Sequence, residues 1–536
     1  MTFDFKEFFP FEEIRGQQSF AIEKILEAFE RKKFVVLQAG TGCGKSALAL
    51  TTGRYLQNRT GLNGSVFITT QKILQAQYEK DFCPPNGEMV SLSSSSNYNC
   101  SYFKGKVNCK DARALLKTQP PNTPFSRNCN HNCEYIKKRG EFLTSGEAVT
   151  NSSFFLLSLL KNKNIMKEFL VIDEAHTIEQ KLSEFIEITI SEYFCQKILN
   201  LEFPSFDKIN TSIRTIDWIK NVFNPNLNKK LDNLTEIVSR IEKIDNNKNL
   251  ILRLTGMGAE KERISEYLRK IKDFHINYNK DDWILNHIND DGKRKIQFKP
   301  ISVEKYAQSV LFAEAKKVLL MSATIIDKDV FAESLGITDY EFIDIPSPFG
   351  VNQKPILYFP VGKMSINEID NTLPKLGEMI KQILEIHKKE KGVIHTHSFK
   401  ILNFLKNFLP NHPRLLIQEN NGSQAILEAH KATLEPTVLV SPSMDEGVDL
   451  KDNLSRFQII CKIPFPYLGD KFNKARMKKQ KKWYAFSTIK KIVQAVGRSI
   501  RNENDYAITY ILDENWEYFY EKNKELFPED FRKSLK

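Results

Sequence analysis

The stretch FVVLQ-AGTGCGKS-ALALTTGRYL, residues 34–56, joins an apolar run, a glycine-rich loop and a helical pattern in that order. Glycines in such a loop let backbone N–H groups curl around an anion, and the N-terminus of the next helix adds positive potential. Lys45 is placed to reach the β- and γ-phosphates of a nucleotide, and the Ser46 hydroxyl to ligate Mg²⁺. The loop residues expected to bind ATP and Mg²⁺ are Gly40, Thr41, Gly42, Cys43, Gly44, Lys45 and Ser46.

The run FLVIDEAH at residues 169–176 ends a second apolar segment in two carboxylates. Asp173 would hold Mg²⁺, directly or through water, and Glu174 would polarise the water that attacks the γ-phosphate. Such a sequence is also found at the solvated start of a helix. Because a complete phosphate-binding loop precedes it, it predicts an ATP-hydrolysing site.

Short apolar runs bounded by glycine or polar residues recur along the chain, separated by helical patterns such as residues 20–30. Continuous apolar strands alternating with helices are typical of parallel sheets covered on both faces. The runs form two groups and therefore predict two α/β domains. The first group is 34–38, 65–69, 169–174 and 317–321, and the second is 392–396, 437–441, 457–463 and 506–511.

Two segments interrupt the first group. Residues 83–145 are rich in Cys, Asn, Ser, Pro and Lys and lack apolar periodicity, so we expect a metal or cofactor to hold them. Residues 185–300 are predicted to be helical. Their clearest sign is a single helical stripe of apolar residues at positions 231, 234, 237, 238, 241 and 244.

Four of the eight cysteines cluster in the first of these segments, with the spacing C-x8-C-x19-C-x3-C. Four thiolates suit either tetrahedral zinc or a 4Fe–4S cluster. Zinc sites usually contain two tight pairs of cysteines, and only the last two cysteines form such a pair here. The expected ligands are Cys100, Cys109, Cys129 and Cys133, and their spacing leaves the identity of the metal open.

Two later segments have the features of a nucleotide-driven motor. KVLLMSAT puts Ser322, Ala323 and Thr324 just after a strand, where they can couple the nucleotide state to a bound strand. In QAVGRSIR, residues 494–501, Gln494, Arg498 and Arg501 share one helical face. The arginines can point at the γ-phosphate across a domain cleft while Gln494 positions water. In isolation a salt-bridged surface helix would be the simpler interpretation, but the complete ATP site favours the catalytic one.

These motifs resemble those of superfamily 2 helicases of the iron–sulphur XPD/DinG-like group, closest to the DinG type, over nearly the whole chain. RGQQ at 15–18 looks like the adenine-reading motif and assigns Arg15 and Gln18 to ATP. ITTQKILQAQY at 68–78 resembles the next motif, whose Thr69, Thr70 and Gln75 would contact the strand. Further matches, in the group's order, are SNYNC at 96–100, AVTNSSFFLL at 148–157 with Asn151, KPISV at 299–303, SPF at 347–349, SPSMDEGVDL at 441–450 and KIPFP at 462–466.

The resemblance implies an α/β fold of two RecA-like P-loop domains, with an iron–sulphur insert and a helical arch insert in the first. It also implies ATP, Mg²⁺ and a 4Fe–4S cluster as cofactors, and 5′-to-3′ travel along DNA. Asp445, Glu446, Gly447 and Asp449 would link strand contact to the ATP cleft. The implied boundaries are 1–82, 146–184 and 301–345 for the first RecA-like domain, 83–145 for the iron–sulphur domain, 185–300 for the arch and 346–536 for the second RecA-like domain.

Basic and aromatic residues suggest where nucleic acid would pass. Tyr102 stands beside lysines in the cysteine-rich insert and is a candidate for stacking on a single strand. Tyr98 and Phe103 in the same segment are explained equally well by packing around the cofactor. The basic run KFNKARMKKQKKW at 471–483 is predicted to be a solvated helix face, with contact to DNA phosphates as the alternative.

The composition limits partners and location. The formal net charge of +12 suits a polyanionic partner, although solubility explains it equally well. The sequence contains neither an apolar run long enough to span a membrane nor a secretory signal pattern. We therefore expect a cytoplasmic, monomeric motor of a bacterium or a phage-infected cell, without membrane contact. The expected substrate is single-stranded, tailed or forked DNA, with RNA–DNA hybrids as a further candidate because such motors contact the backbone.

Three other functions compete with a helicase. A nuclease would need an exonuclease domain ahead of RGQQ, where residue 15 leaves no room, or a separate carboxylate cluster in the core, which the sequence lacks. A nucleotide-switched binding module would not need the complete catalytic motifs. An ATP-driven translocase or remodeller of single strands, with a structural four-cysteine zinc site, remains the alternative.

Overall fold

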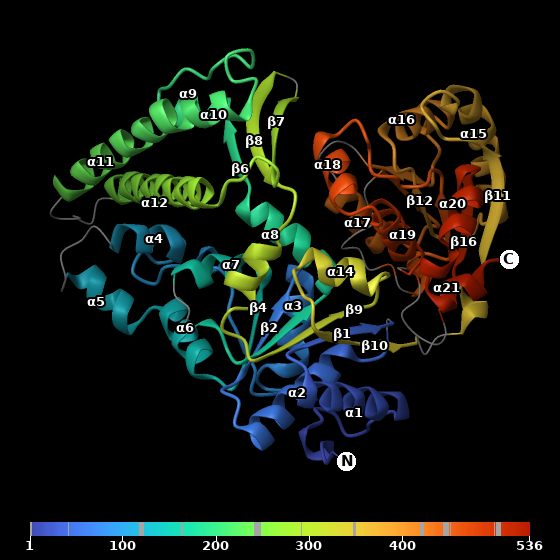
Figure 1. Ribbon diagram of the computed structural model, residues 1–536, viewed down its shortest axis with the longest axis horizontal. Coiled ribbons are helices and arrows are strands. Elements are labelled where there is room, and N and C mark those ends of the chain that lie inside the picture. The colour runs from blue at the N-terminus through green and yellow to red at the C-terminus, as the bar shows by residue number, and fades with distance from the viewer. Residues whose placement is uncertain are drawn as a thin grey trace.

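Two parallel sheets organise the chain in this computed structural model. The structure describes residues 3–40, 42–116, 123–161, 165–240, 248–290, 292–346, 350–418, 423–442, 450, 452–497, 499 and 505–536. Each sheet is the centre of one α/β domain. Figure 1 shows the first domain below the centre and the second, coloured orange to red, on the right.

The first sheet combines strands from distant parts of the chain, and all their described pairings are parallel. Because the strands are parallel, their carboxyl ends meet at one edge, where α/β proteins bind ligands. The strands, in spatial order, are β10 (Tyr340–Ile345), β1 (Phe34–Ala39), β9 (Lys317–Ser322), β5 (Phe169–Asp173), β2 (Ser65–Thr69), β4 (Glu147–Asn151) and β3 (Val90–Ser91). The glycine-rich loop after β1, Ser322 of β9 and Asp173 of β5 therefore lie on neighbouring strands.

Successive residues of these strands alternate between two apolar cores, as the pleat requires. Val35 and Leu37 face a core with α1 (Gly16–Arg31), α2 (Lys45–Thr60) and α3 (Lys72–Phe82). Phe34 and Val36 face a core with α7 (Ser152–Lys161) and α8 (Ile178–Ile186) that continues into the arch. Both faces of the sheet are covered, as the continuous apolar runs predict.

The second sheet is also parallel throughout its described pairings. Its strands, in spatial order, are β11 (Ile356–Gly362), β16 (Ile508–Asp513), β15 (Phe457–Ile460), β12 (Gly392–His395), β14 (Val438–Ser441) and β13 (Leu415–Ile417). One core contains α15 (Ile369–Ile386) and α16 (Phe399–Phe408), and the other contains α19 (Trp483–Val496), α20 (Asn515–Asn523) and α21 (Glu529–Ser534). The two predicted α/β domains are thus confirmed in fold.

The cysteine-rich segment forms short helices around a small core of its own. These are α4 (Cys109–Leu116), α5 (Pro124–His131) and α6 (Glu134–Thr144). The core contains Cys100, Phe103, Val107, Ala112, Phe125 and Cys129. Figure 1 places these helices on the left, below α12.

The second insert is not purely helical. Its helices are α9 (Glu192–Ile198), α10 (Ser212–Trp218), α11 (Asn224–Arg240) and α12 (Lys248–Asn277). At its root lies an antiparallel sheet of β6 (Ile188–Ser191), β8 (Lys293–Pro300) and β7 (Trp283–Asp290), which the helical prediction missed. The sequence carried a signal, because an Asp-Gly pair at 291–292 between two alternating segments is typical of a hairpin. The predicted stripe begins on α11, and its positions 241 and 244 lie outside the described residues.

In the part of the chain that the structure describes, no helix combines the length and apolar character needed to cross a membrane.

Candidate ATP-hydrolysing site and motor interface

A pocket of about 400 Å³ opens at the carboxyl edge of the first sheet. Side chains from the predicted adenine motif, the glycine-rich loop and the acidic motif converge on it. The lining residues are Phe9, Phe11, Glu13, Arg15, Gln18, Gly42, Gly44, Lys45, Ser46, Ala47, Leu74, Gln77, Tyr78, Asp173 and Glu174. A cavity of this size with a phosphate-binding loop at its base suits a nucleoside triphosphate.

Two glycines give the loop its conformation. Gly42 and Gly44 have φ of +83° and +76°, in the left-handed region that side chains disfavour. Lys45 begins α2, and its Nζ donates to Ala39 O at 3.3 Å. Cys43 is buried inside the loop, and burial raises the pKa of its thiol. Gly40 ends the strand side of the loop, where its N–H donates to Ile345 O at 3.4 Å.

Gln18 fastens the first helix to the loop. Its Nε2 donates to Cys43 O at 3.2 Å, and its Oε1 accepts from Arg15 N at 3.0 Å. Arg15 in turn donates to Gly42 O at 3.4 Å. In this structure the amide of Gln18 therefore holds the loop in shape, while its predicted contact with adenine stays a prediction.

The acidic motif includes a residue that the sequence analysis missed. Tyr78 of α3 is buried and donates to Asp173 Oδ2 at 3.1 Å, and it lies within hydrogen-bonding reach of Ser46. Burial, followed by the charge of Glu174, raises the pKa of Asp173 to about 6. A bound Mg²⁺ would counter both effects, because a cation favours the carboxylate form. The donors present, a hydroxyl and a carboxylate, are those that Mg²⁺ prefers.

Glu174 stands in a strained turn directly after β5. Its φ is +51°, and Thr177 N and Oγ1 both donate to its carbonyl, at 3.1 and 3.0 Å. A non-glycine residue in this conformation costs about 1–3 kcal/mol, which the surrounding structure must offset. The turn aims the carboxylate into the pocket, where the predicted role in polarising water requires it.

His176 connects the acidic motif to the other domain. Gln494 Nε2 of α19 lies 2.5 Å from His176 Nε2. With Gln494 as the donor, the imidazole proton would be on Nδ1. Nδ1 faces Ser322 Oγ at 2.7 Å, and Ser322 Oγ donates to Glu174 Oε2 at 3.4 Å. A chain of hydrogen bonds thus runs from the second domain to the expected catalytic carboxylate. No local sequence signal reveals it, because it depends on how the two domains dock.

Gln494 makes a second contact with the first domain, to Thr324 Oγ1 at 3.5 Å. Its Oε1 is buried and has no hydrogen-bond partner among the described residues. The predicted role of Gln494 in positioning water stays a prediction, because in this structure its Oε1 is out of contact with solvent.

Several predicted site residues lie outside the described residues. They are Thr41 of the loop, Arg498 and Arg501 after α19, and Asp445, Glu446, Gly447 and Asp449 after β14, together with SPF at 347–349. Their roles stay predictions.

The candidate strand-contact residues lie at the carboxyl ends of β2 and β4 and on α3, largely buried. Gln75 Nε2 donates to Ser91 Oγ at 2.9 Å, and its Oε1 accepts from Asn151 at 3.1 Å. Its amide therefore ties α3 to the sheet edge in this structure. The hydroxyls of Thr69 and Thr70 are buried without partners among the described residues. Contact of these four residues with a strand stays a prediction.

The four clustered cysteines converge without forming a closed ligand set. Cys109 and Cys133 Sγ are 3.6 Å apart, and the charges of Cys100 and Cys133 act on Cys129. Burial raises the pKa of Cys129 to about 11, so a cation would be needed to hold it as a thiolate near neutral pH. Within the described ranges no group of three or more His, Cys, Asp or Glu side chains has the arrangement of a metal site. The donor chemistry and the convergence fit a metal, although the arrangement does not identify which.

A larger cavity, of about 800 Å³, lies between the cysteine-rich insert, the arch and the first domain. Its lining contains four cations, Lys110 and Arg113 of α4, Arg139 of α6 and Arg263 of α12, and three carboxylates of α12, Glu260, Glu262 and Glu266. The cations of α4 and α6 therefore face the carboxylates of α12. Arg113 lies over the ring of Tyr135 at 5.1 Å. Tyr102 is half-buried and packs against Phe103 and Phe125, with ring centroids 5.1 Å apart in each pair, at the edge of the small core that contains two of the cysteines.

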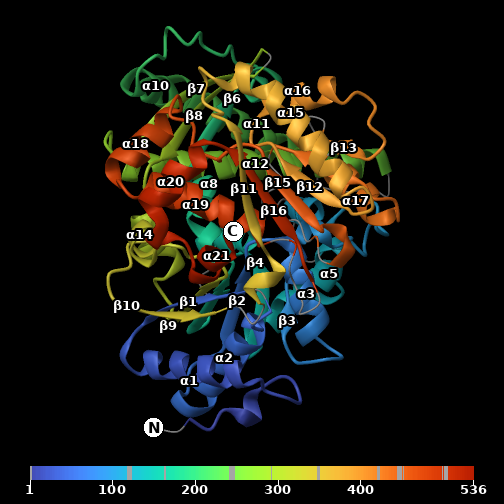
Figure 2. The ribbon, with the colours of Figure 1, turned by 90° about the vertical axis from the view of Figure 1, so that its right-hand side faces the viewer.

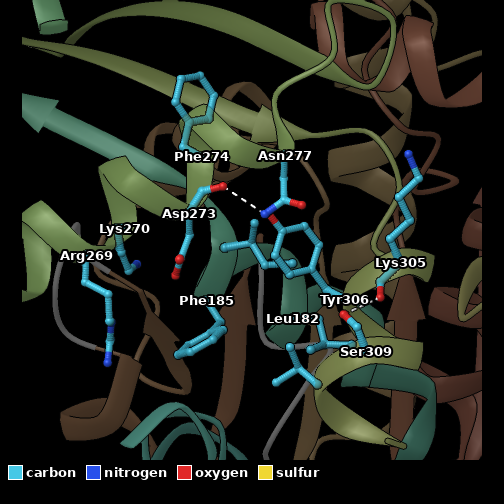
Figure 3. Close-up of a pocket in the computed structure, with 12 residues that line it drawn as sticks. Leu182, Phe185, Arg269, Lys270, Asp273, Phe274, Asn277, Lys305, Tyr306 and Ser309 are labelled. Atoms are coloured by element: carbon cyan, nitrogen blue, oxygen red, sulfur yellow. Dashed lines mark hydrogen bonds between the residues drawn. The ribbon is translucent and has the colours of Figure 1, made fainter.

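A separate pocket of about 200 Å³ lies at the root of the arch (Figure 3). Leu182 and Phe185 of α8 line it together with Phe274 of α12 and Tyr306 of α13 (Glu304–Tyr306). None of its lining residues belongs to the ATP pocket. Residues of α8 and of the arch thus lie around the same pocket. Helix α8, which follows the acidic motif, therefore contacts the arch on the side that faces away from the ATP pocket.

Comparisons of sequence agree with this architecture. Residues 12–205 match the family model described as type III restriction enzyme, res subunit, and residues 380–534 match the helicase C-terminal domain. The probable ATP-dependent helicase MJ0942 of Methanocaldococcus jannaschii is 23% identical, over 95% of this chain and 93% of its own. The ATP-dependent DNA helicase YoaA of Escherichia coli is 20% identical, over 91% and 89%. The ATP-dependent DNA helicase DinG of Photobacterium profundum is 26% identical, over 43% and 36%.

Solved structures show the same fold. One titled XPD_Helicase has a TM-score of 0.64 at 16% identity and covers 96% of this chain and 98% of its own. The structure of S. tokodaii Xpd4 has a TM-score of 0.58 at 15% identity, with coverage of 97% and 99%. With the ordered motifs, the two parallel sheets and the matched family models, this chain is an XPD/DinG-like helicase of superfamily 2.

Proposed function

We propose that this chain is an ATP-dependent DNA helicase that moves 5′ to 3′ along a single strand and unwinds duplex DNA, as a monomer in the cytoplasm. The observation that carries the proposal is the hydrogen-bond chain from Gln494 through His176 and Ser322 to Glu174. It joins the hydrolytic carboxylate of one RecA-like domain to the other domain. A change in how the domains dock would therefore alter the hydrogen bonds of Glu174. A motor needs such a link between domain movement and hydrolysis.

Each residue has a defined part in hydrolysis. Lys45 and the backbone of the loop would hold the phosphates, Ser46 and Asp173 would hold Mg²⁺, and Glu174 and Gln494 would position the attacking water. Arg498 and Arg501 would stabilise charge on the γ-phosphate from the second domain. Opening and closing of the domains would then move the strand.

The cavity beside the cysteines supports a route for the strand. The cations on its insert side, Lys110, Arg113 and Arg139, suit the phosphates of DNA, whereas the carboxylates of α12 would lie on the other side of the strand. Cys100, Cys109, Cys129 and Cys133 would hold a 4Fe–4S cluster, which would give the small insert beside this route the stability that its short core lacks.

Replacing Lys45 with Ala tests the ATP site. We expect strand-stimulated ATP hydrolysis to fall by at least about a hundredfold, because the phosphates lose their cation, while single-strand binding stays within about twofold. Arg59→Ala, at the exposed end of the same helix, is the matched control and should retain full turnover. Hydrolysis by the Lys45 variant at the control rate would refute the assignment.

The direction of travel is tested by strand displacement. Duplexes with a 5′ tail, a 3′ tail or no tail, each as DNA or as an RNA–DNA hybrid, are incubated with ATP. We expect release only from the 5′-tailed duplexes. Preference for a 3′ tail would overturn the polarity, and ATP hydrolysis without release from any duplex would favour a translocase.

The metal is tested by composition. Protein purified without oxygen should contain about four iron atoms per chain and absorb visible light. A colourless preparation with one zinc per chain would replace the cluster with a zinc site.

A further inference from the structure

Helix α18 (Lys471–Lys479) lies against the first domain and the root of the arch rather than in solvent. Figures 1 and 2 both place it beside β7 and β8. The sequence analysis predicted a solvated face for this basic run. Lys471, Lys474 and Lys478 are exposed as predicted, but Arg476 is only 3% exposed. For Arg476 the prediction is wrong, because its side chain is buried against the other domain.

Arg476 has two partners, and both precede the second α/β domain in the sequence. Its Nη2 forms an ion pair with Glu179, and its Nη1 donates to Ile301 O at 2.8 Å. A buried guanidinium costs free energy unless its charge is paired. Glu179 pairs the charge of Arg476 and Ile301 O accepts from its Nη1, while its Nη2 makes no hydrogen bond among the described residues. The planar group reaches both at once, which a lysine cannot do.

Glu179 belongs to the structure that carries the acidic motif. It stands in the first turn of α8, and the short helix Ala175–Thr177 separates α8 from Glu174. His176, three residues before Glu179, is the residue that Gln494 contacts. The second domain therefore contacts both ends of the short stretch 176–179: Gln494 contacts His176, and Arg476 contacts Glu179.

The two contacts come from one continuous unit. Trp483 N at the start of α19 donates to Gln480 O at 3.0 Å, which joins α18 to α19. Gln480 is fixed to the first domain by Nε2, which donates to Glu333 at 2.6 Å and to Val330 O at 3.2 Å. Gln494 lies near the far end of α19. Anchoring α18 thus sets the position of α19 along the interface.

We propose that Arg476 is a positioning residue for ATP hydrolysis: through Glu179 it holds the turn that carries Glu174 and His176 in register with Gln494. The strained turn at Glu174 needs such support, because a residue with φ of +51° persists only where its surroundings fix it. The proposal rests on the proposed function, since it assigns Arg476 to the ATP cycle of the motor.

The test compares four variants of the full chain: Arg476→Lys, Glu179→Gln, the exchange Arg476→Glu with Glu179→Arg, and Lys478→Glu as the control. Lys478 is on the same helix and exposed, and its replacement by Glu makes the same charge reversal as Arg476→Glu in the exchanged pair. The readouts are kcat and KM of strand-stimulated ATP hydrolysis, affinity for a fluorescent ATP analogue, and the midpoint of thermal unfolding.

We expect Arg476→Lys and Glu179→Gln to lower kcat about tenfold, while analogue affinity stays within about twofold, because the glycine-rich loop is untouched. The exchanged pair should recover part of this loss, and the control should match the unaltered chain. Unchanged kcat in the first two variants would overturn the proposal. A parallel fall in kcat, affinity and unfolding midpoint would also overturn it, since that pattern marks a purely structural role. Failure of the proposed function differs from both, because the unaltered chain would then show no strand-stimulated hydrolysis.

Discussion

Single residues determine whether the ATP loop keeps its shape. A Cβ built on Gly44 would lie 2.4 Å from Gln18 Nε2, the atom that donates to Cys43 O. Gly61 at the other end of α2 has a similar φ, +68°, but a Cβ there would meet nothing within 4 Å. Substitutions at the two glycines therefore distinguish the effect of backbone strain, which both would have, from the effect of losing the Gln18 contact, which only Gly44 would have.

Gly44→Ala and Gly61→Ala should both lose about 1 kcal/mol of stability, because each forces a side chain into the left-handed region. Only Gly44→Ala also displaces Gln18, so we expect it to raise the KM for ATP about tenfold or more. Steady-state hydrolysis and thermal unfolding measure the two effects. Equal KM values in the two variants would show that Gln18 does not hold the loop.

The local motifs could be predicted from the sequence, whereas the contacts between them could not. The loop and the acidic pair each lie within one short segment, so their residue types and spacing suffice. The link through His176 joins residues 176, 322 and 494, and it exists only once two domains have docked. The burial of Gln75 depends on the edge strand β3, which is too short to be recognised as a strand.

At the scale of elements, the end of α15 is closed by one side chain from a distant segment. Arg414 donates to four carbonyl oxygens, those of Leu384, His387, Glu390 and Pro436, at 2.6–2.8 Å. The last carbonyls of a helix lack partners within it, so the guanidinium satisfies what the helix leaves open. It also joins α15 to the segment before β14.

Replacing Arg414 with Lys should destabilise the second domain by about 2 kcal/mol or more, because one ammonium cannot reach all four carbonyls. Lys381→Ala, at an exposed position of the same helix, should change stability by less than about 0.5 kcal/mol. Urea unfolding followed by circular dichroism compares the two. Similar shifts for both variants would contradict the assigned role of Arg414.

Eight of the described parallel strands were predictable because each is a continuous apolar run, and most lie within a residue or two of the expected ranges. Strands β3, β4, β10, β11 and β13 were not expected, because they are short or mix polar with apolar residues. The sheet at the root of the arch was missed because β7 and β8 alternate polar and apolar residues, between long helical segments that dominate the pattern. The alternation itself was the available signal.

At the scale of the whole molecule, the positive charge of +12 and the four cations of the large cavity predict strongly salt-dependent strand binding. Each phosphate contact on a single strand contributes about −0.7 to the slope of log K against log salt. Arg139→Gln should therefore make the slope shallower by about 0.7. Lys137→Gln, exposed on the same helix and outside the cavity, should leave it nearly unchanged. Fluorescence anisotropy of a labelled single strand over a salt series measures both slopes, and equal slopes would exclude the cavity as the route.

The order of strands in the first sheet also governs how the protein is made. β1, which holds the ATP loop, lies between β9 and β10, and those strands end only at Ser322 and Ile345. During synthesis the nucleotide loop thus leaves the ribosome long before its neighbours on either side exist. Such distant pairings form slowly, and incomplete domains expose strand edges to aggregation. Both inserts are therefore synthesised before β9 and β10 complete the sheet around the ATP loop. The inserts can begin to fold while the motor domain that contains them is still incomplete.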